Sequence, residues 1–136
     1  MKTRILLIEN QINLAHFIAL ELNAEGYQVS IEHNTKTGLM VAQAWNPGVI
    51  VLSWDLPSDA GAKLHAQLRA EGNQVPIIGM TVDPKNDLPQ QTSLRDRCSR
   101  QKQDIISWLA KPFSMNDLFH AIQQACRKVY AENPQN

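Results

Sequence analysis

The chain has 136 residues, of which 43% are hydrophobic and 19% charged, enough for one compact domain with its own core. Thirteen basic residues balance thirteen acidic ones, so no net field attracts nucleic acid or an anionic membrane. Cys98 and Cys126 match no metal-binding spacing and indicate reduced thiols in a cytoplasmic protein, with a bridge between them as the alternative. No signal peptide and no stretch long enough to span a bilayer is present.

Short apolar runs alternate with segments of helical periodicity along the whole chain. The runs predict five strands, at Ile5–Ile8, Val29–Ile31, Val49–Leu52, Pro76–Met80 and Ile105–Ala110. The first and third contain no polar residue, so both of their faces are expected to be buried. This alternation is typical of a parallel sheet with helices on both faces.

Helical periods and their stop signals fill the spaces between these strands. Four residues at helical spacing predict a first helix that ends at Gly26; they are Leu14, Phe17, Ile18 and Leu22. Thr35 is expected to cap a second helix, which carries Leu39, Ala42 and Trp45 and which Asn46-Pro47 ends. A third helix is marked by Leu64 and Leu68 and ends near Gly72. The sequence from Ser114 to Asp117 resembles a capping box for the last helix, whose apolar positions are Leu118, Ala121, Ile122, Ala125 and Val129.

Residues 83–104 are the irregular part of the chain, rich in Asp, Pro, Gln, Ser and Arg. A long structureless loop is improbable inside a compact domain, so we expect a short, polar fourth helix between Leu88 and Gln103. Residues 1–130 are then one domain, and residues 131–136 are a polar tail or the start of a linker. Five β/α units in this length imply a flavodoxin-like, doubly wound α/β fold with strand order 2-1-3-4-5.

In such a fold the functional crevice lies at the carboxyl ends of the strands. The segments that follow strands one, three, four and five are Glu9-Asn10-Gln11, Ser53 to Pro57, Thr81, and Lys111-Pro112-Phe113. This set, in this order, resembles the receiver domain of bacterial response regulators, and the similarity covers nearly the whole chain. The Leu56-Pro57 and Lys111-Pro112-Phe113 turns resemble the branch that carries a winged-helix DNA-binding domain after a linker.

The resemblance implies a specific phosphorylation chemistry. In receivers, an aspartate ending the third strand accepts a phosphoryl group from a histidine kinase, and two acids after the first strand hold magnesium. A Thr or Ser and a Lys contact the phosphoryl oxygens. Alignment places Ser53 at the acceptor position and Glu9 and Asn10 at the acidic pair, while Thr81 and Lys111 match unchanged. A serine without a base is a weak nucleophile, and losing two carboxylates removes most of the attraction for magnesium.

The sequence therefore favours a phosphorylation-independent pseudo-receiver that binds a partner protein, either in transcription regulation or as a stand-alone adaptor. It predicts no enzymatic activity and no cofactor beyond weakly bound magnesium. Asp55 offers an alternative, since its position two residues past the acceptor directs it toward the pocket rim, where it could act as a phosphoacceptor. Ser53 and Asn10 could also be engineered changes. Thr81 and Lys111 can persist for structural reasons, with Lys111 paired to Glu9.

The expected interaction surface is the face made by the fourth-helix region, the fifth strand and the last helix, including Asp117. It would serve a protein partner or a homodimer, with no direct contact to nucleic acid or membrane. Where the winged-helix branch has an Asp-Asp-aromatic sequence, this chain has Ile106, Ser107 and Trp108. Trp108 could pack inward, or lie outward and form an apolar patch with Ile106. The scattered histidines, His16, His33, His65 and His120, have no ligand spacing and are expected to be surface or helix residues. Whether a DNA-binding domain follows Asn136 would decide between regulator and adaptor.

Overall fold

The computed structural model describes residues 2–82 and 104–132. Its sheet has five strands in the order β2-β1-β3-β4-β5, and every neighbouring pair is parallel. The strands are β1 (Arg4–Ile8), β2 (Gln28–Glu32), β3 (Val49–Ser53), β4 (Ile77–Thr81) and β5 (Ser107–Ala110). This is the doubly wound topology that the sequence predicts.

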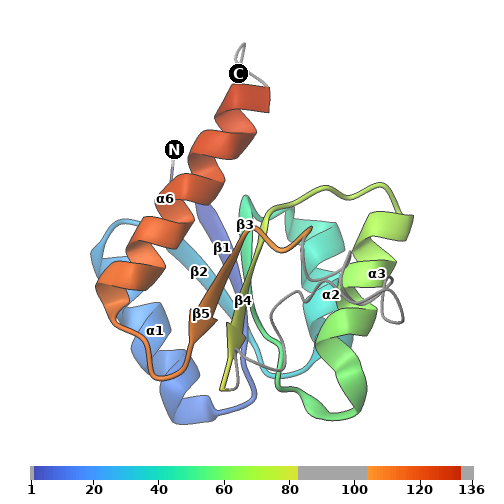
Figure 1. The fold of residues 1–136 in the computed structure, drawn as a ribbon, viewed down its shortest axis with the longest axis horizontal. Coiled ribbons are helices and arrows are strands. Elements are labelled where there is room, and N and C mark those ends of the chain that lie inside the picture. The colour runs from blue at the N-terminus through green and yellow to red at the C-terminus, as the bar shows by residue number, and fades with distance from the viewer. Residues whose placement is uncertain (1, 83–103, 133–136) are drawn as a thin grey trace, which may run out of the picture.

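The helices cover both faces of this sheet (Figure 1). They are α1 (Ile12–Ala24), α2 (Thr35–Trp45), the short 3₁₀ helix η1 (Pro57–Asp59), α3 (Ala60–Ala70) and α6 (Met115–Glu132). Helices α1 and α6 pack on one face, and α2 and α3 on the other. The expected fourth helix lies outside the described residues, and α6 continues into the range 131–136 that the sequence predicts as a tail. No helix in the described part of the chain has the length and apolar character needed to cross a membrane.

The core has two layers because successive strand residues point to opposite faces of the sheet. Ile5 and Leu7 of β1 pack toward α1 and α6, whereas Leu6 and Ile8 pack toward α2 and α3, and all four are fully buried. Each such side chain contributes roughly 1.5–3 kcal/mol by burial. The centre of the sheet is thus a firm base for the loops at its carboxyl end.

The helix ends confirm most of the predicted signals. Gly26, after α1, has a φ of 95°, and Asn46, after α2, has a φ of 52°; both lie in the left-handed region that ends a helix. The Ser114 Oγ accepts a hydrogen bond from the Asp117 N–H at 3.1 Å, as a cap of the last helix should.

The predicted cap of α2 was wrong by one residue. Asn34 has an extended backbone (φ −150°, ψ 165°), and its Oδ1 accepts a hydrogen bond from the Thr37 N–H at 3.0 Å. Only an extended residue before the first turn can fold its side chain back onto these N–H groups. Thr35 is already the first helical residue.

Three other expectations need correction. Strand β4 begins at Ile77, because Pro76 has no N–H to donate to a ladder. Strand β5 begins at Ser107, and Ile105 is instead a buried residue of the core on the α2 and α3 side. Phe17 is 52% exposed, because the residues of α1 that face the sheet are Ala15, Ile18, Ala19 and Leu22.

Candidate functional site

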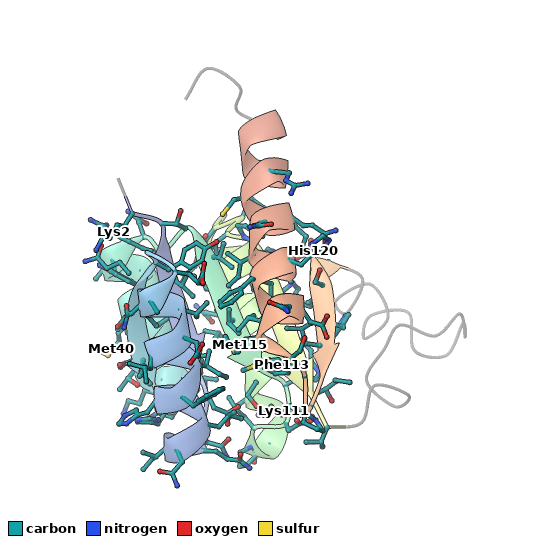
Figure 2. All side chains as sticks on the ribbon, turned by 90° about the vertical axis from the view of Figure 1, so that its left-hand side faces the viewer. Lys2, Met40, Lys111, Phe113, Met115 and His120 are labelled. Carbon is teal, nitrogen blue, oxygen red and sulfur yellow. The ribbon has the colours of Figure 1, made fainter. Side chains whose placement is uncertain are left out.

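The predicted site residues meet at the carboxyl ends of β1, β3, β4 and β5. The sheet register pairs Ser53 with Met80 and Thr81 with Ala110, so the residues that follow these strands share one edge. That edge is the lower end of the sheet in Figure 1. Lys111 lies at the same end in Figure 2, below Phe113 and Met115.

Lys111 connects the residues in the buried half of the site. Its Nζ donates to Glu9 Oε1 at 2.7 Å and to Ser53 Oγ at 3.2 Å. The other Glu9 oxygen, Oε2, accepts a hydrogen bond from the Gln11 N–H at 2.9 Å. Glu9 is fully buried, and the Lys111 side chain is 12% exposed. The pairing of Lys111 with Glu9 that the sequence allows is therefore confirmed.

Asp55 forms the outer half of the site. Its Oδ1 accepts a hydrogen bond from the Thr81 hydroxyl at 3.1 Å, and its Oδ2 accepts one from the Val82 N–H at 2.9 Å. The preceding residue is fixed by a bond from the Trp54 N–H to the Met80 carbonyl at 2.8 Å. The sequence places Asp55 at the rim but gives no sign that Val82 contributes a donor, because a backbone N–H carries no sequence signal.

The donor set offers magnesium at most a weak site. Magnesium takes carboxylate oxygens, keeps several waters, and competes with other cations and donors for the same oxygens. Here both carboxylates of the site, Glu9 and Asp55, accept hydrogen bonds from protein donors. Asn10 is exposed, and within the described residues its side chain joins none of these contacts. In residues 2–82 and 104–132, no three His, Cys, Asp or Glu side chains gather in a way that could hold a metal ion.

Comparison with known proteins identifies the family. The model of the response regulator receiver domain matches residues 5–123. The chain belongs to this family. The response regulator ArlR of Staphylococcus haemolyticus is 32% identical over 126 residues, and the match covers 93% of this chain and 53% of that protein. The transcriptional regulatory protein YkoG of Bacillus subtilis, whose name marks it as uncharacterized, is 29% identical over 127 residues, covering 93% of this chain and 52% of its own.

This receiver thus spans about half the length of the curated relatives it matches. Solved structures support the fold alone, because their sequence identity is low. The signal receiver domain of a putative Luxo repressor protein from Vibrio parahaemolyticus has a TM-score of 0.79 at 16% identity and covers 100% of this chain and 98% of its own. The receiver domain of the Francisella response regulator 1452 has a TM-score of 0.76 at 20% identity, with 94% and 99% covered.

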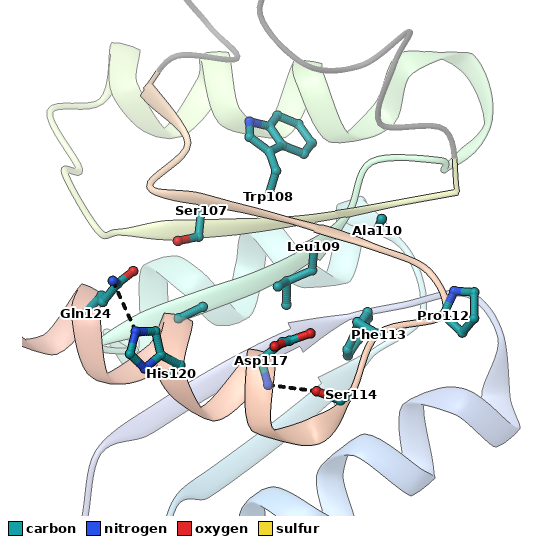
Figure 3. A pocket seen from close by; sticks show the side chains of 11 residues that line it. Ser107, Trp108, Leu109, Ala110, Pro112, Phe113, Ser114, Asp117, His120 and Gln124 are labelled. Atoms are coloured by element: carbon teal, nitrogen blue, oxygen red, sulfur yellow. Dashed lines mark hydrogen bonds between the residues drawn. The ribbon is translucent and has the colours of Figure 1, made fainter.

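Trp108 of this receiver packs inward. Its ring makes an edge-to-face contact with Trp54, with 5.1 Å between centroids and 78° between planes. Figure 3 shows it pointing from β5 toward α3, away from Leu109 and Phe113. A Cβ added to Gly79 would lie 2.6 Å from the Trp108 ring, so the absence of a side chain at Gly79 makes room for the indole. Gly79 and Trp108 are register partners, and an isolated strand glycine is a sequence signal for such a close approach.

The apolar patch of Ile106 and Trp108, the outward alternative, does not form. Ile106 packs against the core on the α1 and α6 side, whereas Trp108 packs on the opposite side of the sheet. Ile106 lies in the bend before β5, so the two-residue alternation of a strand does not apply to it. The predicted surface therefore lacks an aromatic anchor at Trp108.

A pocket of about 540 Å³ nevertheless lies on the expected interaction face. It is bounded by β5, the loop after it and α6 (Figure 3). The side chains on its α6 wall include Asp117, His120 and Gln124. A second pocket, of about 460 Å³, lies between α1 and the loop after β5, and the exposed Phe17 lines it together with Val82 and Met115.

A buried histidine cluster tethers the segment before β5 to α3. His65 is a residue of α3, one of the two positions expected for it, but its side chain is buried at 5% exposure, and its Nε2 lies 2.7 Å from Asp104 Oδ2. Arg69 Nε donates to the same oxygen at 2.6 Å. Burial alone would raise the pKa of Asp104, but the hydrogen bonds from His65 and Arg69 outweigh it and hold this pKa below its ordinary value. Asp104 therefore stays ionised as a partner for both.

Proposed function

We propose that this receiver domain is a phosphorylation-independent signalling module of a bacterial two-component-type response regulator. In this proposal it binds another protein, takes part in transcription regulation and catalyses no reaction. The observation that carries it is Ser53, which stands at the end of β3 where the family has its acceptor aspartate. The nitrogen in contact with Ser53 Oγ is the ammonium of Lys111, which is itself paired with Glu9. This ammonium donates the hydrogen bond, so it does not act as a base for the serine.

The role in transcription regulation rests on the relatives. One bears the name of a transcriptional regulatory protein and others that of a response regulator, and each is about twice as long as this chain. Their additional half leaves room for an output domain, which this chain would control through contact. The stand-alone adaptor is the alternative. Reading the open reading frame past Asn136 separates the two, because an adaptor would end there.

The phosphorylation claim is tested with acetyl phosphate and magnesium. We expect intact-mass spectrometry to show no added phosphoryl group on the unaltered protein. The matched control is the double variant Asn10→Asp and Ser53→Asp, which restores both lost carboxylates and should recover some magnesium affinity and labelling. A base-labile phosphoryl group mapped to Asp55 in the unaltered protein would show instead that it is an ordinary receiver with a displaced acceptor.

The partner surface is proposed on the face of β5 and α6, together with the fourth-helix region. Its described part holds the 540 Å³ pocket, and Asp117 lies on its rim as an exposed charge. Asp117→Arg should weaken self-association or partner binding by about tenfold, since reversing a rim charge costs on the order of 1 kcal/mol. Gln123→Arg is the control, because Gln123 is an exposed α6 residue that does not line the pocket. Light scattering over a concentration series would measure a homodimer, and equal behaviour of both variants would exclude this face.

A further inference from the structure

Two hydrogen-bond donors at the end of β4 point at a single carboxylate. The Thr81 hydroxyl bonds one oxygen of Asp55 at 3.1 Å, and the Val82 N–H bonds the other at 2.9 Å. A hydroxyl and a backbone N–H that converge on one anion form an oxyanion-binding pair. Such charge-assisted bonds are roughly twice as strong as bonds between neutral groups.

The geometry of this pair is fixed on both sides. Thr81 is fully buried at the end of the central part of the sheet, so the position of its hydroxyl is set by the core. Asp55 is exposed but follows Trp54, whose N–H bonds the Met80 carbonyl at 2.8 Å and whose ring packs on Trp108. The turn after β3 therefore delivers the carboxylate to a defined place beside β4.

Lys111, the cationic residue of the same site, is also paired with side chains of this chain. Lys111 gives hydrogen bonds to Glu9 and to Ser53, and Glu9, its ion-pair partner, is fully buried. The two residues that the family uses to contact a phosphoryl group, Thr81 and Lys111, thus both have resident oxygen acceptors. In each case one of these acceptors is a carboxylate of this chain.

We infer that Asp55 is an internal anion that occupies the oxyanion-binding pair of Thr81 and Val82 and holds the end of β4 in one arrangement without a phosphoryl group. This inference rests on the proposed phosphorylation-independent function and gives it a structural cause. A tetrahedral oxyanion such as inorganic phosphate is the ligand that would fit the pair if the Asp55 charge were absent. With the charge present, phosphate meets a carboxylate at the same donors and is repelled.

The test is a titration of the ¹⁵N-labelled full chain with inorganic phosphate, followed at the Val82 amide. We expect this amide to be insensitive to phosphate in the unaltered protein and to shift saturably in Asp55→Asn, which removes the charge at nearly constant shape. Asp59→Asn is the matched control, because Asp59 is also exposed, and its φ of 55° suits asparagine. Sulfate, which has the same shape and charge type, should act like phosphate.

A second measurement does not depend on any ligand. Hydrogen exchange of the Val82 amide should be about five- to tenfold faster in Asp55→Ala than in the unaltered protein, as for the loss of one hydrogen bond worth roughly 1 kcal/mol. Unchanged exchange in Asp55→Ala, or a phosphate-dependent shift of Val82 in the unaltered protein, overturns the inference. Neither of these results bears on the proposed function. The proposed function is refuted separately, by covalent labelling of the unaltered protein with acetyl phosphate.

Discussion

A methyl group at Gly79 is expected to drive Trp108 out of its place over β4. The added Cβ would lie 2.6 Å from Cζ3 and 2.7 Å from Cε3 of the indole, whereas ordinary contact begins at 3.4 Å. Backbone atoms of a central strand cannot retreat, so the ring must give way.

Two routes lead to a similar cost. If the ring stays, overpacking in a filled core costs about 1–3 kcal/mol. If the ring leaves, it loses the edge contact with Trp54, about 0.5–1.5 kcal/mol, and part of its burial, about 1.5–3 kcal/mol when complete. Replacing a glycine within a strand by alanine stabilises the folded state by roughly 0.5–1 kcal/mol, because the unfolded chain loses conformational freedom. The free energy of unfolding should therefore fall by about 2 kcal/mol.

Urea unfolding followed by circular dichroism measures this loss, and near-ultraviolet circular dichroism reports the Trp54 and Trp108 pair. Gly48→Ala is the control, because its Cβ would meet only a Thr3 methyl carbon at 3.4 Å and a carbonyl at 3.7 Å. In a Trp108→Leu background, Gly79→Ala should cost much less than in the unaltered protein. An equal cost in both backgrounds would mean that the strand backbone, not the indole, resists the methyl group.

Two further predictions concern the charged contacts. Lys111→Met should lower the free energy of unfolding by about 3–5 kcal/mol, because it leaves the buried Glu9 without a counter-charge. Adding Glu9→Gln should recover much of this loss. Urea titrations of the single and double variants would show whether the two residues are coupled. The lowered pKa of Asp104 means that its contribution is present above the unfolded-state pKa of about 4 and is lost as the pH falls through the lower folded-state pKa. Because the Asp104 side chain is 45% exposed and solvent screens its contacts, Asp104→Asn should cost about 1 kcal/mol at pH 7. This cost should shrink as the pH falls through the folded-state pKa, and a cost that does not change with pH would contradict the ion pair.

The fold could be predicted because it depends on patterns that the core enforces. Short unbroken apolar runs such as Ile5–Ile8 favour strands covered on both faces, because they are too short for a helix. The left-handed residues Gly26 and Asn46 mark helix ends by their backbone conformation. The cap of α2 shows the limit of such signals. Asn34 and Thr35 are both good caps, and only the backbone conformation of Asn34 decides between them.

The site was predictable where a side chain follows a strand and less so elsewhere. Glu9, Ser53, Thr81 and Lys111 meet because parallel strands end at one edge. The orientation of Trp108 depends on the register of β4 and β5, which places Gly79 opposite it. That register could have been combined with the isolated glycine in the fourth apolar run to predict an inward ring. The bond between Asp55 and the Val82 N–H had no signal in the sequence.

The persistence of Thr81 and Lys111 beside a serine needs no phosphoryl transfer to explain it. Glu9 is fully buried, and a buried carboxylate that loses its partner costs roughly 3–5 kcal/mol, a large part of the stability of a small domain. Lys111 is therefore held by the need to neutralise Glu9. Thr81 is buried as well, and its hydroxyl and the Val82 N–H are satisfied by Asp55. If Ser53 replaces the acceptor, as proposed, these internal contacts account for Thr81 and Lys111 without phosphoryl transfer.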